Sequence, residues 1–347
     1  MTDKKKFVFI VNPISGTQGK QAILRRIRIK MSKIDAEYSI EKTQYAGHAT
    51  QIATQAAQNH VDVVVAIGGD GTVNEVGRAL IHTKTALGII PCGSGNGLAR
   101  HLHIPMDPNA AIDLAIQGEL QCIDYGKIND IPFFCTCGVG FDAFVSLKFA
   151  DSGKRGLLTY LENTLHESLT YKPETYEIVN EEGTQKQKAF LIACGNASQY
   201  GNNAYIAPQA SLTDGLMDVT ILEPFTVLDV PSLSFQLFNK TIDQNSRIKT
   251  MRTKKITIHR TKPGVFHYDG DPMMGDKDLT VEIFHQGLWV VRSLDKKDEE
   301  GKDSENFLQL ITDYFSGLKP KGEKFLSQRQ SQLYKLNRRL LEKLSGK

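Results

Sequence analysis

Three short glycine-containing segments in the first third of the chain could bind phosphate groups. They are residues 12–16, which are followed by Gly19 and Lys20, residues 68–72 and residues 93–97. Glycine lets the backbone bend tightly and bring its N–H groups close to an anion, and a helix N-terminus adds partial positive charge. One such segment alone would be weak evidence. Three segments that each follow a strand-like run predict a phosphate ligand at one edge of a sheet.

The common nucleotide motifs do not fit these segments. Residues 16–21 lack the spacing and the final Ser or Thr of a P-loop, and no segment has the G-x-G-x-x-G pattern of a dinucleotide-binding turn. The sequence therefore predicts phosphate binding by a different arrangement of glycine-rich turns.

Asp70 indicates which chemistry the phosphate site could perform. Its carboxylate lies among glycines, where it would repel a phosphate unless a cation or a proton-transfer role compensated. Phosphoryl transfer needs both a metal that neutralises charge and a base that receives the proton of the acceptor hydroxyl. The simpler alternative is that Asp70 caps the helix that follows it.

The segments around these turns predict alternating strands and helices. Apolar, largely β-branched runs are typical of strands buried on both faces of a parallel sheet. Such runs cover residues 7–11, 61–67 and 86–90, and helical patterns cover residues 19–31 and the stretch containing Val73, Val76 and Leu80. Asp107 followed by Pro108 predicts another helix start. Repeated strand–turn–helix units predict a doubly wound α/β domain over residues 1–124.

A second, β-rich domain is predicted over residues 125–293. Most of its segments look like strands with tight turns, and residues 268–271 form a hairpin-type turn. Two strand-like runs, residues 279–284 and 288–291, are expected to flank a turn at Gln286 and Gly287. Helices are expected at residues 141–150, 156–170 and 226–239.

The C-terminal part divides into three segments. Residues 294–305 form a charged linker, and residues 306–318 include an apolar helix that we expect to pack on the first domain. Residues 319–347 are basic, with leucines along one helical face. This helix could pack on its own protein or on a second subunit, or it could lie on an anionic membrane surface.

Composition narrows the function classes. The 347 residues carry 42 basic and 39 acidic side chains, a net charge of +3 that gives no support to a nucleic-acid partner. Five cysteines form no disulfide framework and favour structural thiols over a metal site. Neither a signal peptide nor the ~18 apolar residues of a membrane span is evident. We expect a cytoplasmic protein that visits the inner membrane surface if its substrate is a lipid.

The glycine-rich segments, taken together, resemble the diacylglycerol kinase catalytic family. That family includes soluble bacterial lipid kinases and the sphingosine and ceramide kinases. The resemblance rests on Asn-Pro-x-Ser-Gly at residues 12–16, Gly-Gly-Asp-Gly-Thr-Val-Asn-Glu at residues 68–75 and Pro-x-Gly-Ser-Gly-Asn at residues 91–96. Further matches are Thr43, residues 47–49, Ala207 with Pro208, Asp214 with Gly215 and Asp218, and residues 269–271.

The resemblance implies a nucleotide-binding α/β domain of the NAD kinase and phosphofructokinase type, a β-sandwich-like second domain, and ATP between them. Asp70, Asp271 and Asp214 would be the catalytic carboxylates, and Asp214 with Asp218 would bind Mg²⁺. The residues implied for ATP binding are Asn12, Ser15, Gly16, Thr43, Gly69, Gly71, Thr72, Asn74, Gly93, Ser94, Gly95 and Asn96. The implied substrate is a membrane lipid hydroxyl, with diacylglycerol favoured, and a homodimer is possible.

Two departures from the family pattern keep alternatives open. The bacterial pattern ends Asp-Gly-Glu, whereas Asp271 stands here in place of the Glu and is shorter by about 1.5 Å. The segment 93–96 looks closer to sphingosine kinases. The alternatives are therefore a sphingoid-base kinase, a kinase of NAD or a sugar phosphate, and a nucleotide-binding regulator without catalysis.

Overall fold

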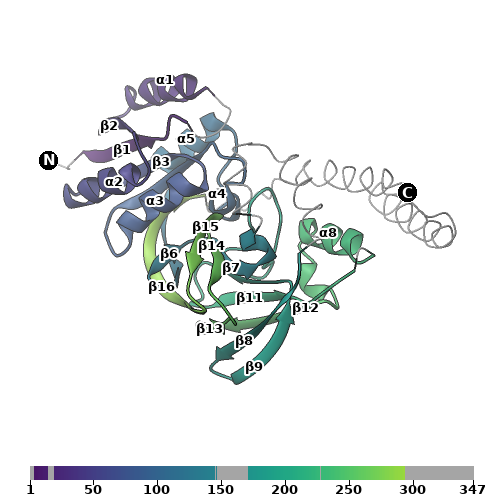
Figure 1. Cartoon of the computed structure of the whole chain (residues 1–347). Helices are drawn as coiled ribbons and strands as arrows, with labels where there is room; N and C mark the ends of the chain where they lie inside the picture. The colour runs from purple at the N-terminus through teal and green to yellow at the C-terminus, as the bar shows by residue number, and fades with distance from the viewer. Residues whose placement is uncertain (1–3, 15–18, 145, 147–170, 227, 294–347) are drawn as a thin grey trace, which may run out of the picture.

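The computed structural model describes residues 4–14, 19–144, 146, 171–226 and 228–293 (Figure 1). Several predictions lie outside these residues. They are the ATP-binding roles of Ser15 and Gly16, the helix at residues 156–170, the linker 294–305, the helix in residues 306–318 and the basic helix 319–347.

The first part of the chain forms a parallel sheet covered by helices on both faces, as predicted. Its strands are β1 (Lys5–Val11), β2 (Ala36–Lys42), β3 (Val63–Gly68) and β4 (Ala86–Pro91), in the order β2-β1-β3-β4. The helices are α1 (Lys20–Met31), α2 (His48–Gln58), α3 (Asp70–Leu80), α4 (Gly97–His101) and α5 (Pro108–Gln117). Helices α1 and α5 pack together on one face and α2 and α3 on the other (Figure 1).

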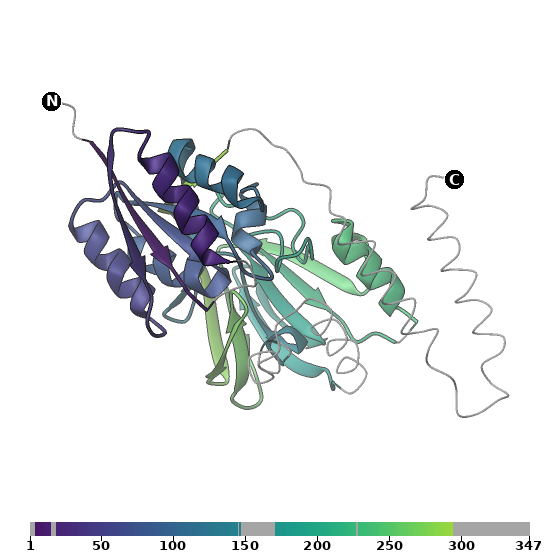
Figure 2. The ribbon, with the colours of Figure 1, turned by 90° about the horizontal axis from the view of Figure 1, so that it is seen from above.

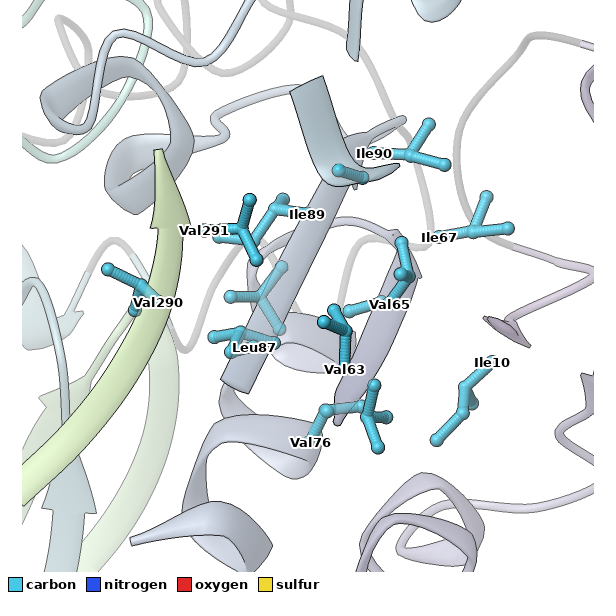
Figure 3. Packing of buried hydrophobic residues seen from close by; sticks show 14 of the residues in the cluster. Ile10, Val63, Val65, Ile67, Val76, Leu87, Ile89, Ile90, Val290 and Val291 are labelled. Carbon is cyan, nitrogen blue, oxygen red and sulfur yellow. The ribbon is translucent and has the colours of Figure 1, made fainter. Parts of the chain in front are cut away.

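The buried strands and helix faces explain this arrangement. Every residue of β3 and β4 is buried, which agrees with their continuous apolar sequences. Val76 of α3 packs against this sheet, as Figure 3 shows for the surrounding aliphatic side chains. Helix α5 begins as predicted, because the Asp107 side chain accepts hydrogen bonds from the N–H groups of Asn109 and Ala110.

The second part of the chain is a β-sandwich. One layer continues the first sheet through β16 (Asp278–Arg292), β13 (Lys255–His259), β8 (Glu174–Asn180) and β9 (Gly183–Ala189), with β5 (Glu119–Ile128) and β6 (Ile131–Phe133) attached. The other layer, sheet B, has the order β12 (Ile248–Thr253), β11 (Met217–Leu222), β10 (Leu191–Gly195), β7 (Thr136–Gly140), β14 (Gly264–Tyr268) and β15 (Asp271–Gly275). The predicted fold class is therefore confirmed.

The two parts share one sheet, and strands cross the predicted boundary. Strand β5 runs through residues 124 and 125 without a break, and Val290 of β16 pairs with Leu87 of β4. Figure 3 shows Val290 and Val291 beside the aliphatic core of the first part. In Figure 2 the α/β part and the β-rich part lie side by side. The last described strand thus ties both parts together.

The turn predicted at Gln286 and Gly287 is wrong. Strand β16 continues through these residues, and its pairing with β5 changes register between Phe284 and Leu288. Gln286 has a φ of 53°, and a side chain at Gly287 would collide with the ring of Tyr125 at 2.3 Å. A glycine after a polar residue predicts a turn, but here it forms a bulge that makes room for an aromatic ring.

Helix α8 (Val230–Phe238) begins later than the predicted residue 226. Asp229 precedes it, and the Asp229 carboxylate accepts hydrogen bonds from the N–H and hydroxyl groups of Thr226. Pro231 then lies in the first turn, where a missing N–H costs nothing. Within the described residues, no helix combines the length and the apolar character needed to cross a lipid bilayer.

Candidate active site

The second glycine-rich turn connects β3 to α3 and carries Asp70 at the first helical position. Gly69 precedes the helix, and no side chain caps its N-terminus. Inside the turn, a side chain at Gly68 would collide with Thr72 at 2.5 Å. The Thr72 hydroxyl accepts a hydrogen bond from the amide Nδ2 of Asn12 at 3.2 Å. The second turn is therefore tied to the end of β1, where the first glycine-rich segment begins.

Asp70 does not cap its own helix. Its Oδ2 accepts a hydrogen bond from the N–H of Asn96 at 2.8 Å, and its Oδ1 accepts one from the N–H of Gly97 at 2.7 Å. These N–H groups belong to the third glycine-rich turn and to the start of α4. Burial raises the pKa of Asp70, and the two backbone hydrogen bonds act in the opposite direction. The Asp70 carboxylate thus takes the place that an external anion could have at this turn.

The glycines of these turns allow backbone to pack on backbone. A side chain at Gly93 would meet the Cα of Gly69 at 2.5 Å, and one at Gly201 would meet the Cα of Gly95 at 2.7 Å. Asn96 closes the third turn, because its side chain donates to the carbonyl of Gly93 and accepts from its N–H, both at 2.9 Å. Gly93 and Gly95 therefore serve close contacts between turns, and their role in ATP binding stays a prediction.

Asp269, on the turn between β14 and β15, fixes the second domain to the first. Its Oδ2 accepts hydrogen bonds from the Asn74 amide at 2.8 Å and from the N–H of Phe134, and its Oδ1 accepts from the N–H groups of Cys135 and Thr136. Asn74 is only 2% exposed. Asn74 was predicted to line the ATP site, but its amide is used in this contact between domains.

Asp271 follows Asp269 and keeps its carboxylate near the second turn. An ideal side chain at Gly71 would lie 3.6 Å from the Asp271 Oδ2. The surrounding protein raises the pKa of Asp271 to about 6, and the negative charges of Asp269 and Asp70 act in the same direction. Asp271, at the start of β15, retains contact with solvent, although the neighbouring protein reduces the hydration of its carboxylate. The structure thus brings Asp70 and Asp271 together from different domains.

Asp214 and Asp218 contact Arg252 instead of this cluster. Arg252 forms an ion pair with Asp214, and its Nε lies 3.4 Å from the Asp218 Oδ1. Burial raises the pKa of Asp218, while Arg252 acts in the opposite direction. Over the described ranges, no group of three His, Cys, Asp or Glu side chains is arranged to hold a metal ion. No interaction joins Asp214 to Asp70 or Asp271 in the part of the chain that the structure describes.

The remaining predicted ATP-binding residues lie at the edge where the parallel strands end. Asn12 follows β1, and the N–H of Thr43 donates to the carbonyl of Val11 at 2.9 Å. Ser94 lies within the third turn, between Gly93 and Gly95. Lys20, at the start of α1, has a buried Nζ without a hydrogen-bond partner among the described residues. An ammonium group in this situation would be well suited to an anion.

Two carboxylates make long-range contacts that were not predicted from the sequence. Asp269 was recognised within a motif, but its hydrogen bonds to residues far away in the sequence were not foreseen. Asp124 is fully buried and accepts hydrogen bonds from the N–H groups of Gly215 and Gln286, both at 2.7 Å, while the His285 ring lies 2.8 Å away. Nothing in the local sequence distinguishes such residues from surface aspartates.

The fold and the site define a two-domain protein whose glycine-rich turns meet carboxylates from both domains. The same fold is found in the crystal structure of a diacylglycerol kinase from Bacillus anthracis str. Sterne, with a TM-score of 0.67 and 19% identity. That similarity covers 85% of this chain and 99% of the solved chain.

Sequence comparison gives the family. Residues 6–128 match the "Diacylglycerol kinase catalytic domain", and residues 135–292 match the "YegS C-terminal NAD kinase beta sandwich-like domain". The chain is 32% identical over 254 residues to the "Probable lipid kinase YegS-like" of Klebsiella pneumoniae (strain 342). The matched residues cover 72% of this chain and 84% of that protein. The chain is 31% identical over 256 residues to the "Probable lipid kinase YegS" of Salmonella arizonae, with the same two coverages. The chain therefore belongs to the diacylglycerol kinase catalytic-domain family, which confirms the resemblance inferred from its motifs.

Proposed function

We propose that this protein is a lipid kinase that transfers the γ-phosphoryl group of ATP to a lipid hydroxyl, with diacylglycerol as the favoured acceptor. The observation that carries the proposal is the meeting of Asp70 and Asp271 at the second glycine-rich turn. The family membership and the names of the relatives support the same activity.

The N-terminus of α3 and the Lys20 ammonium are suited to the phosphates of ATP. The first turn of α3 has a glycine at its N-cap and no side-chain cap, so its partial positive charge is available to an anion. The buried Lys20 Nζ lacks a partner among the described residues. Both features lie at the edge where β1 and β3 end, which is where ligands bind in open α/β sheets.

Asp271 is the better candidate for the base. Both Asp70 oxygens already accept backbone hydrogen bonds, whereas no hydrogen bond to the Asp271 carboxylate is present among the described residues. The pKa of about 6 allows Asp271 to be ionised at neutral pH and still to accept a proton. In the proposed reaction the acceptor oxygen forms a bond to the γ-phosphorus as the bond to the ADP oxygen breaks. The hydroxyl proton passes to Asp271 and then to solvent.

The carboxylates also fit a magnesium ion. Mg²⁺ in kinases is held by one or two carboxylates together with substrate phosphates and water, so a three-ligand protein cage is not required. Asp70 would hold the ion, because each of its oxygens retains a lone pair and negative charge surrounds it. A bound Mg²⁺ would neutralise the charge that develops on the transferred group.

A transfer assay with a mixed acceptor pool tests the proposal. The full-length protein would be incubated with Mg²⁺ and γ-labelled ATP in detergent micelles of a total membrane lipid extract, and the labelled product would be identified by mass. Parallel incubations would contain diacylglycerol, a sphingoid base or NAD as the only acceptor. We expect phosphorylated diacylglycerol. The lipid kinase proposal would be refuted if NAD alone became labelled, or if none of the acceptors became labelled.

A further inference from the structure

Three side chains form a buried polar cluster that the proposed phosphoryl transfer does not yet use. The His267 Nε2 lies 3.0 Å from the Asp142 Oδ2, and the Tyr200 hydroxyl donates to the same oxygen at 3.2 Å. The other Asp142 oxygen accepts from the N–H of Ala143 at 2.7 Å. The side chains of His267 and Asp142 are only 2% and 8% exposed. In a buried cluster of this kind, each polar atom is expected to have a partner.

One polar atom of this cluster lacks a partner. The Nδ1 of His267 is buried and has no hydrogen-bond partner among the residues that the structure describes. In the neutral ring with the proton on Nε2, this nitrogen is an acceptor, whereas in the charged ring it is a donor. An unpaired donor on a buried cation costs more than an unpaired acceptor on a neutral ring. The neutral tautomer therefore fits best, and Nδ1 can accept a hydrogen bond from an O–H or N–H group.

The backbone around the cluster makes room for the carboxylate. His267 on β14 pairs with Gly138 on β7, and a side chain at Gly138 would lie 2.6 Å from the Asp142 Oδ2. Phe266 and Tyr268 point into the sandwich core, so His267 points to the opposite, outer face of sheet B. Glycine at position 138 is thus required for Asp142 to reach His267.

The cluster lies between the third glycine-rich turn and a buried apolar cluster. The carbonyl of Tyr200 would lie 3.2 Å from a side chain at Gly97, and a side chain at Gly95 would lie between the Tyr200 carbonyl and Asp70. On the other side, Tyr200 packs against the apolar cluster on the outer face of sheet B, which includes Phe141 and Phe190. This order runs from the turn that is held by Asp70, through the polar cluster, to apolar side chains. A molecule with a polar head and an apolar tail has the same order.

We propose that His267, held by Asp142 and Tyr200, binds the polar head of the acceptor lipid by accepting a hydrogen bond from one of its O–H or N–H groups. This inference rests on the proposed lipid kinase activity and adds to it the residues that position the acceptor. Asp142 keeps the ring in the tautomer that leaves Nδ1 free to accept, and Tyr200 connects this position to the third glycine-rich turn.

The test replaces the ring while keeping its bond to Asp142. The amide of Gln reaches the position of Nε2 but offers no atom at Nδ1, so His267→Gln removes the proposed acceptor contact. We expect kcat/KM for the lipid acceptor to fall about 5- to 100-fold, which corresponds to loss of one buried hydrogen bond. The Kd for ATP, measured in the absence of lipid, should stay unchanged. An unchanged KM and kcat for the acceptor in a folded variant would overturn the inference while leaving the lipid kinase intact.

The matched control is His82→Gln. His82 also pairs with a tyrosine hydroxyl, that of Tyr125 at 3.1 Å, but it lies away from the glycine-rich turns. Its replacement should leave the acceptor KM unchanged. A fall in kcat/KM equal to that of His267→Gln would indicate a general structural effect and would count against the proposal.

A readout without catalysis separates the two proposals. Protein labelled with ¹⁵N in its histidines would be titrated with detergent micelles with and without the total lipid extract. We expect the Nδ1 resonance of His267 to show an unprotonated acceptor that shifts only when lipid is present. If this resonance does not shift, the inference is wrong. Because the measurement uses the wild-type protein, it does not require His267→Gln to fold. A lipid-dependent shift in a protein that transfers phosphate to no lipid would support acceptor binding and refute the kinase.

Discussion

The second and third glycine-rich turns have similar sequences but opposite environments. The second turn starts α3 without a side-chain cap, and Asp271 approaches it from the other domain. The third turn starts α4, and there the N–H groups of Asn96 and Gly97 already donate hydrogen bonds to the Asp70 carboxylate. The second turn faces the Asp271 carboxylate, which is the proposed base. The third turn is closed by the Asp70 carboxylate, which accepts hydrogen bonds from its N–H groups.

This difference shows that a glycine-rich turn does not by itself identify an anion site. The N–H groups at a helix start need an acceptor, and a side chain of the same protein can supply it as well as a ligand can. Gly93 is conformationally ordinary but sterically constrained, because the Cα of Gly69 lies where its side chain would be. The third turn therefore supports the second turn, and the second turn is the better candidate to bind phosphate.

The largest effect, a fall in the rate of phosphoryl transfer, is expected from removing the Asp271 carboxylate beside the second turn. Asp271→Asn should lower the transfer rate ~10²- to 10⁴-fold, as loss of a positioned base does. In the wild-type protein the rate should rise as the pH increases through about 6, because Asp271 must be ionised to accept a proton. This rise should be absent in the variant. A variant with near-normal turnover and the same pH profile would exclude Asp271 as the base.

The same substitution should stabilise the folded protein at neutral pH. The pKa of Asp271 is about 6 in the fold and near 3.8 ordinarily, so the folded state binds more protons between these values. The free energy of unfolding therefore decreases as the pH rises through this window. Asp271→Asn lacks this decrease, and urea unfolding at pH 7 should show a higher midpoint than for the wild-type protein. A lower midpoint would indicate that the Asp271 charge is stabilised, contrary to the raised pKa.

The contact between the two turns is tested by Gly93→Ala. Its methyl group would lie 2.5 Å from the Cα of Gly69, and backbone cannot move aside as easily as a side chain. We expect a loss of about 1–3 kcal/mol in the free energy of unfolding, measured in urea. The control is Gly71→Ala, whose methyl group would lie at an ordinary 3.6 Å from Asp271 within a helix. Equal stability changes in the two variants would contradict close packing of the turns.

The elements that carry the site could be predicted from local sequence, because burial on both faces of a parallel sheet produces apolar runs such as β3 and β4. The turns after them could be predicted because Gly and Asp mark a change of direction. The contacts between them could not be predicted in the same way. Asp70 meets Asn96 across 26 positions, and Asp269 meets Asn74 across 195. Such pairs depend on how the sheets are assembled, and no short-range pattern contains that information.

The bulge at Gln286 and Gly287 illustrates the same limit for a single element. The local sequence is equally compatible with a turn and with a bulge in one long strand. The Tyr125 ring decides between them, since it occupies the space that a side chain at Gly287 would need. Asp142 and His267 are a further example, because an isolated histidine in a strand gives no sign of a carboxylate 125 positions away.

The smallest change in the free energy of unfolding is expected from Asp70→Asn, at the turn that the Asp70 carboxylate closes. The amide keeps one acceptor, so one of the N–H groups of Asn96 and Gly97 would face an NH₂ group at a cost of about 1–3 kcal/mol. Because burial raises the pKa of Asp70, removal of its charge offsets part of this cost.

The control is Asp107→Asn at the exposed start of α5, where a single oxygen accepts two N–H groups and Asn is as good a cap as Asp. Urea unfolding should show a loss of stability for Asp70→Asn and almost none for Asp107→Asn. Equal results would mean that the third turn does not depend on the carboxylate, and its N–H groups would then be as available to phosphate as those of the second turn.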